Sequence, residues 1–188
     1  MLTQLFQHID LVVSQVLQSF QPSWLTDIAR HVSGVCAPRF VVPALIVSLI
    51  VWWYSRQKHR EAIQFAAVLT GNIFSFILKP LIERPRPVDG VVRVMVYEPT
   101  YSFPSGHALA IALGAGFLWL WSNHFSRPVC WVIRLVAIVA FLAVGWSRIY
   151  LGAHWLSDVV AGYAIGLLWV GAVWLYWPKV LARTLKKI

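Results

Sequence analysis

The chain has 188 residues, of which 59% are hydrophobic and 12% are charged, and its formal net charge is +9. A soluble domain is typically about 45–50% apolar and about 25% charged, so this composition excludes an ordinary water-soluble fold. The basic residues fall between apolar segments and form no exposed stripe, which argues against a nucleic-acid-binding protein. We therefore predict an all-α, polytopic membrane helical bundle that forms a single domain over residues 1–188.

The first 35 residues are predicted to form two amphipathic helices that lie in the membrane interface. Apolar residues recur at helical spacing through residues 1–20, while glutamines, His8 and Asp10 share the other face and Pro22 ends the segment. This segment is too polar to span, although a poor first span is the alternative interpretation. Residues 24–35 indicate a second, shorter interfacial helix.

Five apolar segments between residues 37 and 178 are predicted to form the transmembrane bundle. Each is close to the roughly 20 residues that are needed to cross about 30 Å of hydrocarbon. In chain order, the predicted spans are about Ala37–Tyr54, Ala62–Leu78, Ser105–Trp121, Val129–Ser147 and Trp155–Trp177.

Basic residues between the spans predict the orientation of the bundle. The loops after the first and third spans carry Arg56, Lys58, Arg60 and Arg127, and residues 179–188 form a basic tail on the same side. The positive-inside rule makes this side cytoplasmic, so the N-terminus lies outside and the C-terminus inside. We expect a multi-pass protein of the cell (inner) membrane.

Ionisable residues also gather on the opposite, extracytoplasmic side, at the ends of the spans. Two loops that five spans bring to this face hold Lys79, Glu83, Arg84, Arg86, the YSFPSGH turn at residues 101–107, Arg148, His154 and Asp158. Singly, each residue has a simpler interpretation as an interface anchor or a helix-end charge. Ionisable groups at membrane depth cost about 2.5–3.5 kcal/mol at the centre, so their combination favours a functional site.

The residue types at this face suit a phosphoryl group. Arginine binds phosphate oxygens with two N–H groups, lysine adds a point charge, and the helix that follows Pro-Ser-Gly presents backbone N–H groups. His154 and Asp158 are four residues apart and would share one face of a helix, so the carboxylate would orient the imidazole as a nucleophile. His107 remains as a proton donor.

Three sequence motifs in this region carry a family resemblance. They read Lys79-(six residues)-Arg86-Pro87, Pro104-Ser105-Gly106-His107 and Ser147-Arg148-(five residues)-His154-(three residues)-Asp158. Together they resemble the three-part signature of the type 2 phosphatidic acid phosphatase superfamily. The resemblance covers about residues 79 to 158, and the N-terminal third departs from a common six-span layout because its first segment reads as interfacial.

The resemblance implies a role for each matching residue. His154 would attack phosphorus and form a phosphohistidine, Asp158 would orient it, and His107 would protonate the leaving oxygen. The phosphate would be held by Lys79, Arg86, Ser105, Gly106 and Arg148. Arg84 and Glu83 lie outside the matching positions; Arg84 is a candidate for binding a headgroup or a second phosphate, and Glu83 is a candidate for the headgroup or for pairing with Arg84. The resemblance also implies a metal-independent reaction without a cofactor, and the sequence contains no carboxylate cluster for Mg²⁺.

The expected substrate is a lipid phosphate or diphosphate that enters the site from the bilayer. The first choice is undecaprenyl diphosphate, cleaved to undecaprenyl phosphate. The alternatives are phosphatidylglycerophosphate, phosphatidic acid and a lipid A substrate, the last with phosphatase or phosphotransferase chemistry. From another class, the chain would be a non-catalytic lipid-binding membrane protein. We expect no nucleic acid and no obligate protein partner.

Cysteine labelling tests the predicted orientation. With the two native cysteines replaced, a cysteine introduced at position 90 should react with an impermeant thiol reagent in intact cells, and one at position 58 should react only after permeabilisation. Both expected labelling results follow from the distribution of basic residues between the spans. The reverse pattern would contradict the predicted topology.

Overall fold

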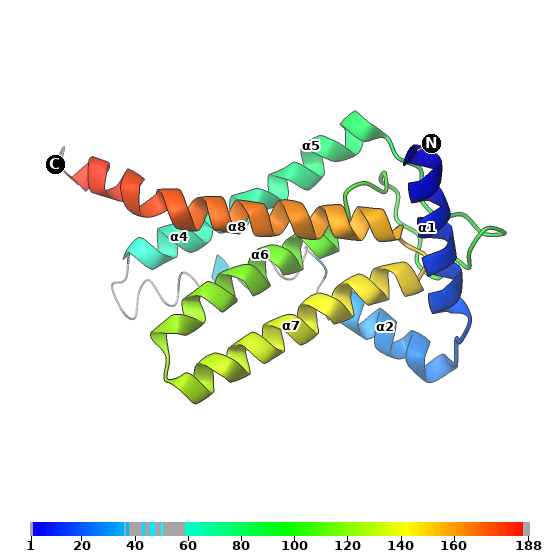
Figure 1. Cartoon of the computed structure of the whole chain (residues 1–188), viewed down its shortest axis with the longest axis horizontal. Coiled ribbons are helices and arrows are strands. Elements are labelled where there is room, and N and C mark those ends of the chain that lie inside the picture. The colour runs from blue at the N-terminus through cyan, green and yellow to red at the C-terminus, as the bar shows by residue number, and fades with distance from the viewer. Residues whose placement is uncertain are drawn as a thin grey trace.

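The computed structural model describes residues 2–35, 37, 43, 46, 47, 50 and 59–185, and every regular element within these ranges is helical (Figure 1). The elements are α1 (Leu2–Gln18), α2 (Ser23–Val35), α4 (His59–Leu69), the 3₁₀ turn η1 (Thr70–Asn72), α5 (Ile73–Ile82), α6 (Gly106–Trp121), the 3₁₀ turn η2 (Ser122–His124), α7 (Arg127–Tyr150) and α8 (Leu156–Leu185). The predicted all-α class is confirmed for these residues.

Three helical segments of the described chain are long and apolar enough to cross a membrane, namely Gln64–Ile82, Arg127–Tyr150 and Leu156–Tyr176. They coincide with the second, fourth and fifth predicted spans. The third predicted span forms α6, which has 16 residues and is therefore shorter than the roughly 20 expected of a full crossing. Most of the first predicted span lies outside the described residues, so the total of five spans stays a prediction.

Helix α6 forms the centre of the bundle, with α7, α8 and α4 packed around it (Figure 1). Its side chains Leu109, Leu113 and Phe117 are buried in a cluster that also contains Phe65 of α4 and Val170 of α8. Burial on several sides explains why α6 is apolar all round rather than along one stripe. The amino-terminal end of α6 is thereby held in place beside its neighbours.

Helices α1 and α2 stand where the sequence predicts helices. Helix α1 crosses the end of the bundle near the start of α8, and α2 packs against α7 (Figure 1). Apolar side chains of α1 such as Phe6 and Val16 are exposed, whereas Asp10 is only 2% exposed. The polar face of α1 therefore packs partly against the protein. The placement of both helices in a membrane interface stays a prediction.

Two glycines of α8 allow its close approach to α6. A Cβ atom added at Gly162 would lie 2.7 Å from the backbone oxygen of Ser105, and one at Gly166 would lie 2.6 Å from the Cβ of Ala112. Neither neighbour is the flexible end of a side chain, so an added methyl group must push the two helices apart.

Replacing Gly166 by alanine should therefore destabilise the protein by about 1–3 kcal/mol, the usual cost of overpacking. Gly171→Ala is the matched control on the same helix, because nothing lies within 4 Å of the added Cβ. Thermal unfolding in detergent should give a lower midpoint for Gly166→Ala only. Equal midpoints for the two variants would contradict the close packing of α6 and α8.

Candidate active site

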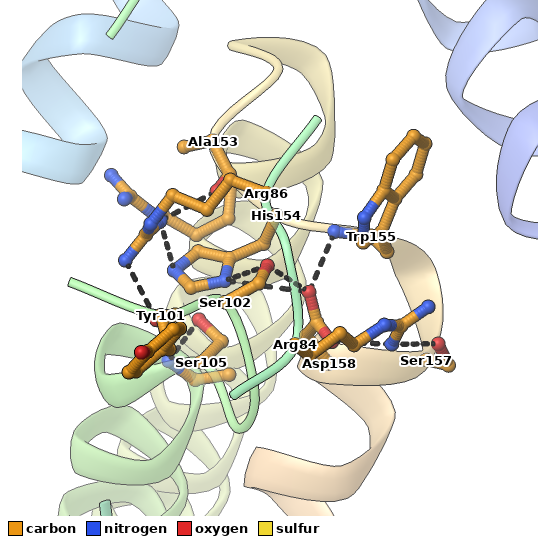
Figure 2. Close-up of polar contacts among 12 residues, drawn as sticks. Arg84, Arg86, Tyr101, Ser102, Ser105, Ala153, His154, Trp155, Ser157 and Asp158 are labelled. Atoms are coloured by element: carbon orange, nitrogen blue, oxygen red, sulfur yellow. Dashed lines mark hydrogen bonds and ion pairs between the residues drawn. The ribbon is translucent and has the colours of Figure 1, made fainter. Parts of the chain in front are cut away.

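The candidate site lies at the end of the bundle where α7 ends, α8 begins and α6 begins. The loop from Glu83 to Ser105 passes over this end and brings the first two sequence motifs to the third (Figure 2). Arg86 Nη1 donates a hydrogen bond to the backbone oxygen of Ala153 at 2.6 Å, and the Ser105 N–H donates to the backbone oxygen of Asp158 at 3.0 Å. The three motifs therefore meet in one place.

His154 and Asp158 form a buried pair, with exposed fractions of 1% and 0%. The distance from His154 Nδ1 to Asp158 Oδ2 is 3.6 Å. Helix α8 begins at Leu156, so His154 lies in the turn before the helix and not on it. The prediction that the two residues share a helix face is therefore wrong in its geometry, although their side chains still meet.

Several donors fix the Asp158 carboxylate in this position. Ser102 Oγ and the backbone N–H of Trp155 both donate to Oδ2, the latter at 3.0 Å. Ser102 Oγ also lies 3.4 Å from His154 Nδ1. The Nδ1 edge of the imidazole thus faces a held carboxylate and a hydroxyl group, and the Nε2 edge faces the opposite way (Figure 2). Sequence reasoning placed Ser102 in the YSFPSGH turn but gave it no role.

Two arginines and one glutamate surround the Nε2 edge. Arg86 Nη1 lies 3.2 Å from His154 Nε2, and Arg86 Nη2 donates to Glu98 Oε2 at 2.9 Å. The buried Arg148 donates through Nη2 to Glu98 Oε1 and through Nη1 to Ser33 of α2 at 2.5 Å. Glu98 Oε2 is 4.0 Å from His154 Nε2. We call Arg86 and Arg148 the arginine cradle.

Glu98 is the member of this group that sequence reasoning missed. It comes from the loop of residues 88–100, which carries no apolar periodicity and lies outside the three motifs. Its carboxylate accepts hydrogen bonds from both arginines of the cradle. The only signal in the sequence was its nearness to the second motif.

The surrounding charges set the protonation states of His154 and Glu98. Burial, followed by repulsion from Arg148 and Arg86, lowers the pKa of His154 well below its ordinary value of 6.5. Burial alone would raise the pKa of Glu98, but the positive charges of its surroundings, Arg148 first among them, lower it to about 2. At neutral pH the imidazole is therefore neutral and Glu98 is an anion.

The hydrogen bonds also select the tautomer of His154. Arg86 Nη1 is a donor, so its contact with Nε2 requires a lone pair on that nitrogen. The ring proton then lies on Nδ1, toward Asp158 and Ser102. A neutral imidazole whose unprotonated Nε2 faces the Arg86 guanidinium group is equipped to act as a nucleophile.

Helix α6 begins beside this group. Ser105 is its N-cap, and the Ser105 Oγ accepts from the Ala108 N–H at 3.4 Å. The Ser105 N–H already donates a hydrogen bond to the backbone oxygen of Asp158. The first backbone N–H at this helix start that could bind a ligand is therefore that of Gly106, the first helical residue. His107 is half-buried on the first turn, and its charge contributes to the lowered pKa of Glu98.

Lys79, Glu83 and Arg84 have separate partners. Lys79 Nζ donates to the backbone oxygen of Tyr101 at 2.5 Å, and Glu83 accepts from the Tyr101 hydroxyl at 3.1 Å. Arg84 points inward instead, with Nη1 donating to Asp158 Oδ1 at 2.5 Å and Nη2 to Asp10 Oδ2 at 2.6 Å. Sequence reasoning placed Asp10 on a polar helix face and did not connect it with the site.

A cavity of ≈ 690 Å³ opens next to the arginine cradle. Its lining combines the cationic groups Lys79, Arg84 and Arg86 with Glu98, Tyr101 and the apolar Phe76 of α5, whose side chain is 76% exposed. A pocket that joins cations to an exposed apolar helix face fits a molecule with an anionic head and an apolar tail.

A membrane helical bundle with these residues at one end defines a class of membrane phosphatase, and comparison with known proteins identifies the family. Residues 60–182 match the PAP2 superfamily. The chain is 28% identical over 170 residues to phosphatidylglycerophosphatase B of Bacillus subtilis (strain 168), covering 88% of this chain and 82% of that protein. The chain belongs to the PAP2 superfamily and is a membrane lipid phosphatase of this type.

Two further similarities agree with this assignment. An undecaprenyl-diphosphatase of Sulfolobus acidocaldarius is 34% identical over 103 residues, which cover 53% of this chain and 45% of that protein. The crystal structure of the first transmembrane PAP2 type phosphatidylglycerolphosphate phosphatase from Bacillus subtilis superposes with a TM-score of 0.81 at 26% identity, covering 93% of this chain and 87% of that one.

The lowered pKa of Glu98 predicts a pH dependence of stability. A carboxylate whose pKa is lower in the folded state stabilises the fold above its unfolded pKa, and this contribution is lost as the pH falls through the folded value. Wild-type protein should therefore lose thermal stability as the pH falls from 4.5 toward 2. Glu98→Gln should show a smaller loss over this range, as measured by unfolding midpoints in detergent.

The control for this experiment is Glu83→Gln, which removes an exposed carboxylate of the same surface. It should keep the wild-type pH dependence. An unchanged pH dependence in Glu98→Gln would contradict the ion pairs of Glu98 with the arginine cradle.

Proposed function

We propose that this protein removes the terminal phosphate of a lipid phosphate or diphosphate through a phosphohistidine formed on His154. The observation that supports this most directly is the position of the Glu98 carboxylate, which is held by Arg86 and Arg148 at 4.0 Å from His154 Nε2. A phosphoryl group offers the same kind of oxygen acceptors to the same two guanidinium groups. In that position its phosphorus would face the Nε2 lone pair.

The cradle also has a donor that an anion would satisfy. Within the described part of the chain, the buried Nε of Arg148 has no hydrogen-bond acceptor. A buried donor without an acceptor costs about 1–3 kcal/mol. A phosphate oxygen bound in place of the Glu98 carboxylate would supply an acceptor that the carboxylate does not.

The proposed reaction has two steps. His154 Nε2 attacks phosphorus while the bond from phosphorus to the leaving oxygen breaks, and His107 gives its proton to that oxygen. Water then attacks phosphorus, His107 takes a proton from the water, and the N–P bond breaks to restore His154. Asp158 balances the positive charge on the ring, while Lys79 and the arginine cradle stabilise the phosphoryl oxygens. The backbone N–H of Gly106 adds a donor at the start of α6.

No step in this scheme needs a metal ion, because Lys79, Arg86 and Arg148 supply the positive charge that a metal would otherwise provide. We propose that the site faces the extracytoplasmic side of the membrane, with the C-terminus in the cytoplasm. The lipid would enter from the bilayer along the cavity beside Phe76.

The first candidate substrate remains undecaprenyl diphosphate, and the similarity to a protein named undecaprenyl-diphosphatase supports it. Phosphatidylglycerophosphate is the second candidate, favoured by the similarity along 88% of this chain to phosphatidylglycerophosphatase B. The cavity lining does not distinguish the two, since both offer a terminal phosphate on an apolar anchor.

Phosphate release by purified protein tests the proposal. Undecaprenyl diphosphate, phosphatidylglycerophosphate and phosphatidic acid would be offered side by side in EDTA. We expect release from at least one of them, and we expect His154→Ala to lose it, because no other group would take the place of the nucleophile. His31→Ala is the matched control, since His31 is an exposed histidine of α2 and its removal should leave the rate unchanged.

Four outcomes are informative. Preference for the diphosphate would support the first candidate, and preference for phosphatidylglycerophosphate the second. Wild-type activity in His154→Ala would refute the assignment of the nucleophile, and a strict metal requirement would refute the metal-free scheme.

A further inference from the structure

We propose that Asp10 of α1 positions the His154–Asp158 pair through Arg84, so that the amino-terminal helix is a working part of the active site. Asp10 and Arg84 act here as positioning residues, since neither touches the arginine cradle. This inference rests on the proposed function, because it assigns Asp158 its role beside the nucleophile.

Asp10 makes three polar contacts although it is almost completely buried. Its Oδ2 accepts from Arg84 Nη2 at 2.6 Å and from Ser157 Oγ at 2.7 Å, and its Oδ1 accepts from the Ser157 backbone N–H at 2.8 Å. Ser157 is the second residue of α8, so this N–H is one that the helix itself leaves without an acceptor. Asp10 thus caps α8 from a different helix and places a negative charge at its positive end.

Arg84 links this cap to the catalytic carboxylate. Its Nη2 donates a hydrogen bond to Asp10. Its Nη1 donates to Asp158 Oδ1 at 2.5 Å and to Ser157 Oγ at 2.6 Å (Figure 2). One guanidinium group therefore joins two buried carboxylates. Each would be costly if it were left as an uncompensated charge. Asp10 also fixes the orientation of the Arg84 guanidinium group, because it binds the second nitrogen, Nη2.

This arrangement fixes the direction of the Asp158 carboxylate. Arg84 binds Oδ1, so Oδ2 is left for Ser102, the Trp155 N–H and the Nδ1 edge of His154. If Arg84 loses its anchor at Asp10, Asp158 loses the constraint on Oδ1 and the imidazole loses a fixed partner. Displacement of a reacting group by about 1 Å can cost about 100-fold in rate. The effect should appear in kcat, since the phosphate-binding groups are not disturbed.

Docking of α1 does not depend on Asp10 alone. Val13 and Leu17 of α1 pack against a buried cluster of Ala108, Ile149 and Val159. Gln18 Nε2 adds a hydrogen bond to the backbone oxygen of Tyr150 at 2.9 Å. A change at Asp10 that conserves volume should therefore leave α1 in place, and this separates a positioning role from a role in folding.

Asp10→Asn is the first test, with the substrate that gives the highest wild-type rate. In metal centres, partners that orient a reactive group are worth about 10- to 100-fold in affinity or activity, and we expect a loss of kcat of that order with KM unchanged. The lost hydrogen bonds at the start of α8 should lower the unfolding midpoint but leave the protein folded at the assay temperature. Asp27→Asn is the matched control, because Asp27 is an exposed aspartate of α2. An unchanged kcat in Asp10→Asn would overturn the inference.

A double variant tests whether Asp10 acts through Arg84. If it does, Asp10→Asn combined with Arg84→Gln should be no slower than Arg84→Gln alone, because the link is already broken. Losses that multiply would show independent effects and overturn the inference.

Chemical rescue provides a test that does not require Asp10 to be changed. A cavity of ≈ 290 Å³ lined by Gln7, Asp10, Arg84 and Trp155 gives a small cation access to this point. Guanidinium ion at non-denaturing concentration should restore kcat in Arg84→Ala, whereas methylammonium should not, because only the planar ion can hold two carboxylates. Rescue by both ions, or by neither, would contradict the bridging role.

The same set of variants separates the two proposals. If the wild-type protein releases no phosphate from any of the lipids, the proposed function fails. If the wild type is active and His154→Ala is not, but Asp10→Asn equals the wild type, only the positioning role fails.

Discussion

The structure depends on a balance of charges around one buried neutral imidazole. His154 and Asp158 are withdrawn from water almost completely, and so is Arg148. A buried charge is tolerated only when partners compensate it, and removing one partner leaves the other uncompensated. Here Arg148 is compensated by Glu98, while Asp158 is compensated by Arg84. Burial first, and then repulsion from Arg148 and Arg86, lowers the pKa of the imidazole and keeps it in its neutral form.

Helix ends supply part of this group, while His154, Glu98 and Arg84 come from the connecting segments. The last turn of α7 supplies Arg148, the first turn of α8 supplies Asp158, and the start of α6 supplies Gly106 and His107. The hydrogen bond from the Ser105 N–H to the Asp158 backbone oxygen ties two of these ends together. Side chains on rigid helix termini are placed more precisely than side chains on loops, and reaction rates depend on that precision.

The sequence predicted those features that depend on spacing along the chain. Apolar runs located three segments that the structure shows as candidate spans, and the motif spacing brought Arg86, Arg148, His154 and Asp158 into one site. Glu98 was missed because a single acid in an irregular loop carries no period. Asp10 was missed for a different reason, since a charged residue on the polar face of an amphipathic helix needs no other explanation, and its partner Ser157 is 147 positions away.

Detection of a phosphorylated His154 would test the central claim most directly. Substrate labelled with ³²P in its terminal phosphate would be mixed with the protein, and the reaction would be stopped in alkaline detergent within a single turnover, since phosphohistidine survives alkali and is lost in acid. The account predicts a transient, acid-labile label on His154 that forms before free phosphate appears. Release of phosphate without any labelled protein, or a label on another residue, would contradict it.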